Sequence, residues 1–285
     1  MTDPDGQAWR EQATGRADSY LQQWALRADG PAQQGSRSLV IPVRTSENVL
    51  AVLKVGRPDR DTEHEHLVLR RWGGEGAVRL LRADPHHRAV LLERLHPRDL
   101  TTSWDVEACE VVASLYRRLH VPAMPQLRSL ATVVRDWVRE FEALPRNAPI
   151  PHRLVEQAAA VGRELAADTS GVDRVVHGDL HYGSVLAGDR EPWLAIAPRP
   201  YNGDPHCELA PMLWHRWDEL AGRIRDGVRL RLATLIDVAG FDEDRARAWV
   251  LVRVVHSAAQ EVSKGTRADT TLLTKCVALA KAVQD

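Results

Sequence analysis

The hydrophobic pattern of the chain changes once, near residue 96, and this change constrains the fold more than any other feature. Before it, short apolar runs rich in β-branched residues alternate with polar turns, as strands do. These runs span 39–43, 49–55, 77–82 and 88–95. After it, apolar residues recur at three- and four-residue spacing, which is typical of amphipathic helices. The order predicts an α+β protein with its strands gathered in the first third.

We divide the 285 residues into two lobes on this pattern. Residues 1–95 are expected to form a helix over 7–27 and an antiparallel sheet, with one charged helix over 61–72 inserted between strands. Residues 96–285 are expected to form a mostly helical lobe. The first helices predicted there cover 104–119, 128–144 and 151–168. A non-helical stretch rich in His, Gly, Asp and Pro, over 175–205, interrupts this lobe and is the candidate catalytic-type loop.

Composition excludes several classes of protein. The 38 Lys and Arg residues balance 39 Asp and Glu residues, so the general attraction to nucleic acid is missing. No apolar run is long enough to span a bilayer, and the polar N-terminus lacks the apolar core of a signal peptide. Three scattered cysteines cannot form a disulfide framework. We predict a cytoplasmic protein that binds neither nucleic acid nor membrane.

Lysine is rare in this chain, and its placement is informative. Only four of the 38 basic residues are lysines, and Lys54 is the only one before Lys264. Most solvent-exposed positive charges in this chain are therefore expected to be arginines. Lys54 lies in a predicted strand, where it is either an ordinary solvated side chain or a compact point charge that serves a ligand.

The loop over 175–205 carries the residues best suited to chemistry. Asp179 stands between His177 and His181, directly after the apolar pair Val175-Val176. A carboxylate in such a place can accept a proton from a hydroxyl held nearby. The same residues also fit a polar turn in which the aspartate caps backbone amides. Spacing alone leaves both interpretations open.

Several motifs, in one consistent order, resemble a known family. They are His177-Gly-Asp-Leu-His-x-Gly-x-Val-Leu186, Trp193-Leu-Ala-Ile-x-Pro-x-Pro-Tyr201, Gly203-Asp-Pro205, Met212-Leu-Trp-x-Arg-Trp-Asp-Glu-Leu220 and Val52-Leu-Lys-Val55. Together they resemble the aminoglycoside/hydroxyurea phosphotransferases of the streptomycin 6-phosphotransferase type. The resemblance covers nearly the whole chain. It implies a protein-kinase-like fold with two lobes, a β-rich N-lobe and a mostly helical C-lobe.

The resemblance assigns nucleotide-binding roles in the first lobe. Lys54 is expected to hold the phosphates of ATP, with Glu65 as its partner and Glu63 as the second choice. The stretch from Glu93 to Leu95 is expected to be the hinge, where backbone groups meet adenine. The turn expected to cover the phosphates, over 33–38, has one glycine where several are usual.

The resemblance also assigns roles in the second lobe. Asp179 is expected to accept the proton of the acceptor hydroxyl, with His177 and His181 supporting the loop. The acceptor pocket is expected to include the side chains His215, Trp217, Asp218 and Glu219, with His215 standing where the family has asparagine. A core helix whose aromatic residues pack inward is the alternative interpretation of that segment.

Two positions depart from the family at its metal ligands. Ser184 stands where the family has asparagine, and Ala197 stands where it has the aspartate that bridges Mg²⁺ to the phosphates. Alanine offers no ligand atom, and a serine hydroxyl cannot replace the lost charge. Asp204 and Glu208 are the nearby carboxylates that could substitute.

The expected function follows from what is kept and what is lost. With Lys54 and Asp179 present but the metal ligands replaced, we expect a pseudokinase with lost or strongly reduced transfer from Mg-ATP. Such a protein acts by binding a small-molecule ligand or a protein partner, or by repurposed chemistry. The alternative is an active ATP-dependent phosphotransferase that acts on the hydroxyl of an aminoglycoside-like compound or another secondary metabolite. The resemblance implies ATP and Mg²⁺, and the two replacements put the metal in question.

Overall fold

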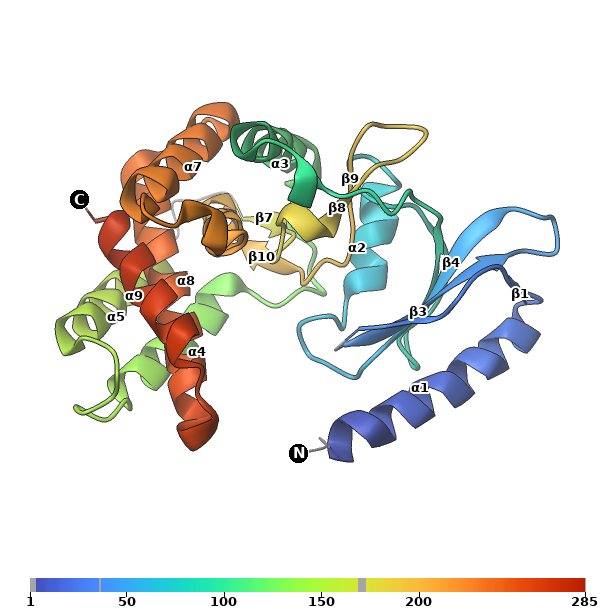
Figure 1. Cartoon of the computed structure of the whole chain (residues 1–285), viewed down its shortest axis with the longest axis horizontal. Helices are drawn as coiled ribbons and strands as arrows, with labels where there is room; N and C mark the ends of the chain where they lie inside the picture. Colours follow the sequence, from blue (N-terminus) through green and yellow to red (C-terminus); the bar gives the residue numbers. More distant parts are fainter. Residues whose placement is uncertain (1–3, 36, 169–172, 285) are drawn as a thin grey trace. The chain divides into compact units, whose positions relative to one another are not determined.

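The computed structural model describes residues 4–35, 37–168 and 173–284, and Figure 1 traces the chain. The chain is divided into two compact units. The first comprises Met1–Arg98 and Leu186–Pro200, and the second comprises Asp99–Val185 and Tyr201–Asp285. The chain thus returns to the first unit for residues 186–200, which we had assigned with the helical lobe.

An antiparallel sheet forms the centre of the first unit. Its strands are β1 (Arg27–Ala28), β2 (Gln33–Gln34), β3 (Ser38–Arg44), β4 (Leu50–Gly56), β5 (Leu80–Asp84) and β6 (Ala89–Glu93). The strand order is β1-β3-β4-β6-β5, with β2 paired to β3. Strands β3, β4 and β6 match the predicted runs to within about two residues, whereas β5 begins at Leu80, later than the predicted run over 77–82. Ser36, in the turn that we expected to cover phosphates, lies outside the described residues.

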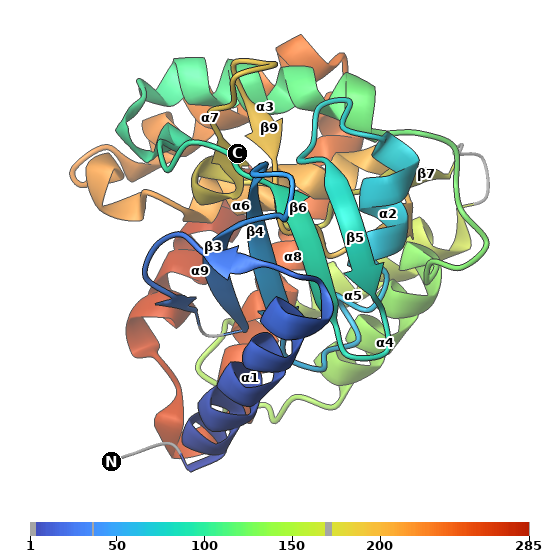
Figure 2. The ribbon, with the colours of Figure 1, turned by 90° about the vertical axis from the view of Figure 1, so that its right-hand side faces the viewer.

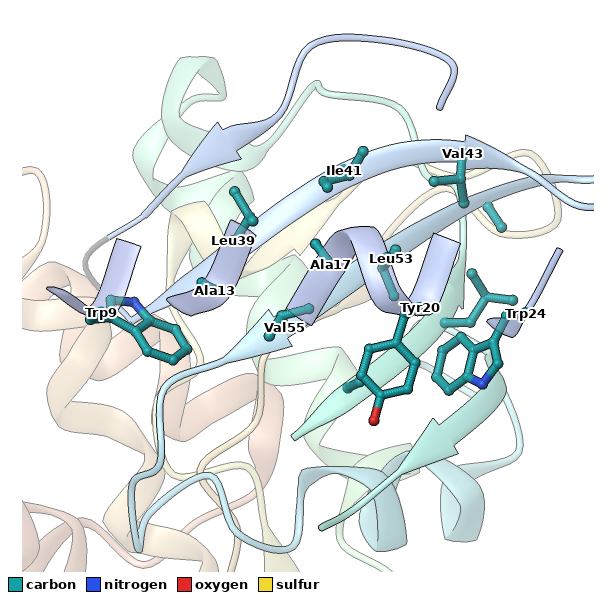
Figure 3. Close-up of a cluster of buried hydrophobic side chains, with 13 residues drawn as sticks. Trp9, Ala13, Ala17, Tyr20, Trp24, Leu39, Ile41, Val43, Leu53 and Val55 are labelled. Carbon is teal, nitrogen blue, oxygen red and sulfur yellow. The ribbon is translucent and has the colours of Figure 1, made fainter. Parts of the chain in front are cut away.

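One face of this sheet is covered by the helix α1 (Pro4–Gln23), as Figure 2 shows. Alternate residues of β3 and β4 point toward α1, because side chains along a strand alternate between the two faces. Figure 3 shows the resulting core. Its labelled members are Trp9, Ala13, Ala17, Tyr20, Trp24, Leu39, Ile41, Val43, Leu53 and Val55.

The opposite alternation places Lys54 on the other face of β4. Its strand neighbours Leu53 and Val55 are buried in the core beneath α1, whereas Lys54 is half-buried. The helix α2 (Glu65–Trp72) follows β4 and ends at Gly73, whose φ of 60° is in the left-handed region that favours glycine. It is shorter than the predicted helix over 61–72, since it begins only at Glu65.

Helices make up most of the second unit. They are α3 (Asp105–Leu119), α4 (Leu130–Glu142), α5 (His152–Ala167), α6 (Ala210–Trp214), α7 (Ile224–Ala239), α8 (Glu243–Ser263) and α9 (Thr270–Ala282). The pairs α4/α5, α3/α7 and α8/α9 pack extensively. This unit and the sheet of the first unit confirm the predicted α+β class. No helix in the described part of the chain is both long and apolar enough to cross a membrane.

Short strands and 3₁₀ turns make up the rest of the described secondary structure. The strands are β7 (Arg174–Val176), β8 (Val185–Leu186), β9 (Leu194–Ala195) and β10 (Tyr201–Gly203). The 3₁₀ turns are η1 (Leu100–Thr102), η2 (Tyr182–Ser184), η3 (Pro205–Leu209), η4 (Trp217–Leu220) and η5 (Gly265–Arg267). Strand β10 pairs antiparallel with β7, so that Tyr201 lies opposite Val176. This pairing fixes the strand from which the polar loop emerges.

Candidate functional site

Lys54 of β4 is paired with Glu65, the first residue of α2. Its Nζ lies 2.6 Å from Oε1 and 2.8 Å from Oε2. The two side chains are 13% and 10% exposed, so their attraction is less screened than that of a surface pair. Glu63, the second candidate, is turned instead toward Arg88, with 3.5 Å between Oε1 and Nη2. The pair leaves Lys54 as a fixed positive charge on the face of the sheet opposite α1.

The proposed hinge residue Glu93 uses its side chain within the first unit. Its carboxylate accepts hydrogen bonds from the backbone N–H of Arg79 at 2.7 Å and from the guanidinium of Arg190 at 2.7 and 3.1 Å. Its own N–H donates to the carbonyl of Arg79. Leu95 packs near Gly188, where a Cβ would lie 3.3 Å from its Cδ2. Both side chains therefore lie against the segment 186–200, and Glu93 is hydrogen-bonded to it through Arg190.

Asp179 belongs to a loop whose backbone is held from beneath by a buried carboxylate. Glu208 of η3 is fully buried, and its two oxygens accept the N–H groups of His177 and Gly178. Burial raises the pKa of Glu208, but the nearby imidazole of His120, whose Nε2 lies 3.6 Å from Oε1, and the charge of His177 outweigh it, so the net pKa is lowered. The carboxylate therefore stays ionised at neutral pH.

A second brace comes from α8. The Nη2 of Arg253 donates to the carbonyl of Gly178, and its Nη1 donates to the carbonyl of Cys207, both at 2.9 Å. Gly178 has a φ of 81°, a conformation that favours glycine. His177 is fully buried, and its Nδ1 accepts the N–H of Asp179 at 3.3 Å. This geometry fits the expected supporting role of His177.

Ser184 closes the loop on itself. Its hydroxyl accepts the N–H of His181 at 2.7 Å and lies 3.0 Å from the carbonyl oxygens of both Asp179 and His181. The Nδ1 of His181 accepts the N–H of Gly183 at 3.1 Å. The two side chains thus form a reciprocal cap of η2. Ser184 is a structural residue of the loop in this geometry.

The proposed acceptor residues fall into two groups. The ring of His215 is stacked on that of His181, with 3.8 Å between centroids and 7° between planes. Glu219 is bound by the guanidinium of Arg216 at 2.6 and 2.7 Å. Asp218 is exposed and Trp217 is half-buried, both on η4. The structure brings His215 to the polar loop and ties Glu219 to its own segment.

The residues at the expected metal-ligand positions do not fit Mg²⁺. Ala197 is exposed and has no ligand atom, and the hydroxyl of Ser184 is engaged as described above. Glu208 is committed to the backbone of the loop. Among the described residues, no cluster of three or more His, Cys, Asp or Glu side chains could hold a metal ion. Mg²⁺ prefers carboxylate oxygens, and these positions do not supply them.

Asp204, the other substitute considered, is also occupied. It accepts hydrogen bonds from the N–H and Nδ1 of His206, and from Arg245 and Trp249. Burial raises the pKa of Asp204, but the bonds from His206 and Trp249 bring it down to about 2. The carboxylate of Asp204 therefore stays ionised, and its charge is balanced by Arg245.

Arg253 and the bracing role of Glu208 were not predicted. Arg253 interrupts the apolar run from Trp249 to Val255, and a charge inside such a run is a signal of a buried polar contact. Glu208 lies three residues after the Gly203-Asp-Pro205 turn, and this position in the sequence does not indicate which group its carboxylate binds. Its target is the backbone of His177, 31 residues earlier.

Residues 23–265 match the sequence profile of the aminoglycoside/hydroxyurea antibiotic resistance kinases. The chain belongs to this family. Curated relatives also match the chain over most of its length. It is 39% identical to a streptomycin 6-kinase of Streptomyces glaucescens over 93% of its own length and 88% of the relative. It is 41% identical to a hydroxyurea phosphotransferase of Kitasatospora aureofaciens over 91% of its own length and 76% of the relative.

Solved structures share the fold of this chain at low sequence identity. The aminoglycoside phosphotransferase APH(4)-Ia aligns with a TM-score of 0.66 and 15% identity, over 95% of this chain and 99% of the other. The choline kinase LicA of Streptococcus pneumoniae aligns with a TM-score of 0.65 and 12% identity, over 96% and 99%. The predicted family and kinase-like fold are confirmed. The relatives are named as kinases and phosphotransferases, which supports the active alternative better than the expected loss of transfer.

Proposed function

We propose that this chain is an ATP-dependent phosphotransferase that acts on a hydroxyl group of a small molecule. The observation that carries the proposal is the Lys54–Glu65 pair, which keeps a compact cation fixed on the sheet. In kinases such a pair is needed for the nucleotide phosphates to be held correctly. Membership of a family of kinases supports the same conclusion.

The chain's own residues supply positioning and a proton acceptor. Lys54 offers a point charge to the phosphates of ATP. Asp179 takes the proton of the acceptor hydroxyl while the oxygen of that hydroxyl bonds to the γ-phosphorus of ATP. The bond from that phosphorus to the bridging oxygen breaks at the same stage, and ADP leaves. Glu208 and Arg253 hold the backbone around Asp179 in place.

The acceptor is proposed to be a hydroxylated small molecule of the kind that the relatives' names indicate. One relative is a streptomycin 6-kinase and another is a hydroxyurea phosphotransferase. His215, Trp217 and Asp218 are the proposed acceptor contacts, because His215 is stacked on the ring two residues after Asp179. Glu219 is not proposed to contact the acceptor, because its charge is balanced by Arg216.

The cysteines support a proposed location in the cytoplasm. Cys109, Cys207 and Cys276 are all free and buried. Burial raises the pKa of the Cys109 thiol to about 12 and that of Cys276 to about 11, so neither is a ready thiolate. Unpaired, unreactive thiols fit a reducing compartment.

The proposal is tested by measuring acceptor-dependent release of ADP, with streptomycin and hydroxyurea as separate acceptors. Asp179→Asn is expected to lower the rate by about 10²–10⁴-fold, because the proton acceptor is lost. Lys54→Met is expected to raise the KM for ATP strongly, whereas Lys281→Met, an exposed lysine of α9, is the matched control and leaves the rate unchanged. Absence of acceptor-dependent ADP release with either compound contradicts the proposal.

A second candidate function rests on Ala197. If the missing carboxylate has abolished transfer, the protein acts as a binder of a nucleotide, a small molecule or a protein partner. Phosphoryl transfer depends mainly on electrostatic stabilisation, so the loss of a charged ligand weighs heavily. This candidate predicts ATP binding that is indifferent to Mg²⁺.

Calorimetric titration with ATP, with and without Mg²⁺, separates the two candidates. Ala197→Asp is expected to make ATP binding Mg²⁺-dependent and about tenfold tighter with the metal if the carboxylate is what the site lacks. Ala197→Asn is the matched control, because it adds the same bulk without the charge. Equal effects of the two variants contradict the assignment of Ala197 to the metal position.

A further inference from the structure

The turn that follows α6 has an unusual backbone. His215 is extended, with φ −79° and ψ 157°, and Arg216 lies in the left-handed region, with φ 50° and ψ 36°. Residues other than glycine, asparagine or aspartate rarely adopt that region, because their Cβ atom crowds the backbone. Such a conformation persists only where surrounding contacts hold it.

Arg231 of α7 supplies those contacts. Its guanidinium is 1% exposed. Nη1 donates to the carbonyl of His215 at 2.7 Å, and Nη2 donates to the carbonyl of Arg216 at 3.2 Å. These are the carbonyl groups on either side of the left-handed residue. The end of a helix leaves carbonyl groups without helical partners, and a buried guanidinium satisfies several at once.

The same guanidinium is linked to the polar loop. Its Nε donates to Oδ2 of Asp105 at 2.7 Å, and Oδ1 of Asp105 accepts the hydroxyl of Tyr182. Tyr182 is the first residue of η2, and its ring also lies 5.5 Å from the guanidinium carbon of Arg231. Arg231 therefore touches both the turn after α6 and the loop that carries Asp179.

The ring of His215 is where the two segments meet. Its Nδ1 lies 2.7 Å from the carbonyl of Pro211, and since a carbonyl only accepts, that nitrogen carries the proton. The ring then lies flat against that of His181. Two flat rings at 3.8 Å need their planes set accurately, and the backbone of His215 sets one of them.

We propose that Arg231 is a positioning residue of the phosphotransferase site: by holding the carbonyl groups of His215 and Arg216, it sets the His215 ring against His181 and so fixes the wall on which the acceptor rests. The part of this proposal that concerns the acceptor rests on the proposed function, whereas the part that concerns the geometry of the rings does not. A merely structural role for Arg231 predicts lower stability without a specific change at His215.

The imidazole signals of the two histidines in NMR test the geometry directly. Arg231→Lys keeps the charge but cannot reach both carbonyl groups and Asp105, so the Hε1 and Hδ2 signals of His215 and His181 are expected to move as the stack is displaced. Arg245→Lys is the matched control. It loses guanidinium bonds to Asp168 and Asp204, and it is expected to move the signals of His206, which shares Asp204, and not those of His215.

A second variant keeps the test decisive if Arg231→Lys fails to fold. Asp105→Asn weakens the bond to Nε of Arg231 and leaves the rest of the guanidinium contacts, so it is expected to move the same signals by a smaller amount. Unchanged His215 and His181 signals in the folded variants overturn the proposal. So does Arg245→Lys, if it moves those signals as much as Arg231→Lys does.

Kinetics then connect the geometry to the acceptor. With whichever of streptomycin and hydroxyurea is turned over, Asp105→Asn is expected to raise the acceptor KM about fivefold or more and to leave the KM for ATP within about twofold. Equal changes in both KM values overturn the acceptor role. If the wild-type protein turns over neither compound, the proposed function fails, and the NMR signals still decide whether Arg231 holds His215.

Discussion

Ala197 holds a backbone conformation that its side chain does not favour. Its φ is 55°, in the left-handed region, where alanine is about 1–2 kcal/mol less stable than in the right-handed one. Aspartate and asparagine enter this region more readily. The backbone at this position therefore suits an aspartate or asparagine better than the alanine that is present.

Replacing Ala197 with glycine is therefore expected to stabilise the protein. Glycine adopts a φ of 55° without crowding, and after its own loss of chain entropy the gain is about 0.5–1 kcal/mol in the free energy of unfolding. Urea denaturation measures it. Ala233→Gly, at an exposed position inside α7, is the control and should lower stability by about 1 kcal/mol. A loss of stability in Ala197→Gly contradicts the strain at this position.

Single residues were predictable from the sequence where their type was rare or their motif was dense. Lys54 is conspicuous because nearly all other basic residues of the chain are arginines. Asp179 is conspicuous because histidines stand close to it on both sides in the sequence. The hydrogen bonds of Ser184 and the brace from Glu208 could not be predicted. They depend on which backbone groups come near in the fold, and no residue pattern encodes that.

At the scale of elements, α1 is attached to the sheet by a polar contact beyond its apolar core. The hydroxyl of Tyr20 donates to Oδ2 of Asp84 at 2.6 Å, at the end of β5, and His87 contacts the same oxygen at 3.1 Å. The hydrogen bond from Tyr20 is the largest cause that lowers the pKa of Asp84, which falls from 3.8 to about 2. Burial works in the opposite direction but is the smaller effect.

This contact predicts a pH dependence for the stability of the protein. Because the folded pKa of Asp84 lies below the unfolded value of 3.8, its contribution is fully present above that value and is lost as the pH falls through about 2. Tyr20→Phe is expected to lower the free energy of unfolding by about 1 kcal/mol near neutral pH, and the difference from wild type should shrink between pH 4 and 2.

The control for Tyr20→Phe is Tyr116→Phe. The hydroxyl of Tyr116 donates to a backbone carbonyl, that of Glu208, which does not titrate. Its difference from wild type should therefore stay constant over the same pH range. Urea denaturation across this range measures both variants. A constant difference for Tyr20→Phe would show that the hydroxyl does not hold Asp84 ionised.

The longer elements were predicted to within a few residues, and the short ones were not. Strands β3 and β4 show clear alternation, and α3 to α5 show helical spacing. Strands β1 and β2 have two residues each, with no pattern to detect, because they exist only through pairing with β3. Helix α1 ends at Gln23, short of the predicted 27, where Ala25 turns with a φ of 51°.

At the scale of the whole molecule, the order of the elements predicted the fold class. Contacts between residues distant in sequence determine which segments belong to each of the two units. Residues 186–200 lie within the predicted loop over 175–205, yet they belong with the sheet. Arg190 holds them there through Glu93, 97 residues earlier. Local spacing carries no information about such a contact, so the sequence placed this segment with its neighbours in the chain.

The family and the retained residues make the molecule a phosphotransferase in our account, with an altered metal position. The most direct test is a ³¹P NMR spectrum of the protein with ATP, Mg²⁺ and streptomycin, and a second with hydroxyurea. We predict that the γ-phosphate signal is lost and that signals of ADP and of a phosphorylated acceptor grow with at least one compound. No such product is expected with Asp179→Asn. Unchanged ATP with both compounds, or equal product from Asp179→Asn, would contradict this prediction.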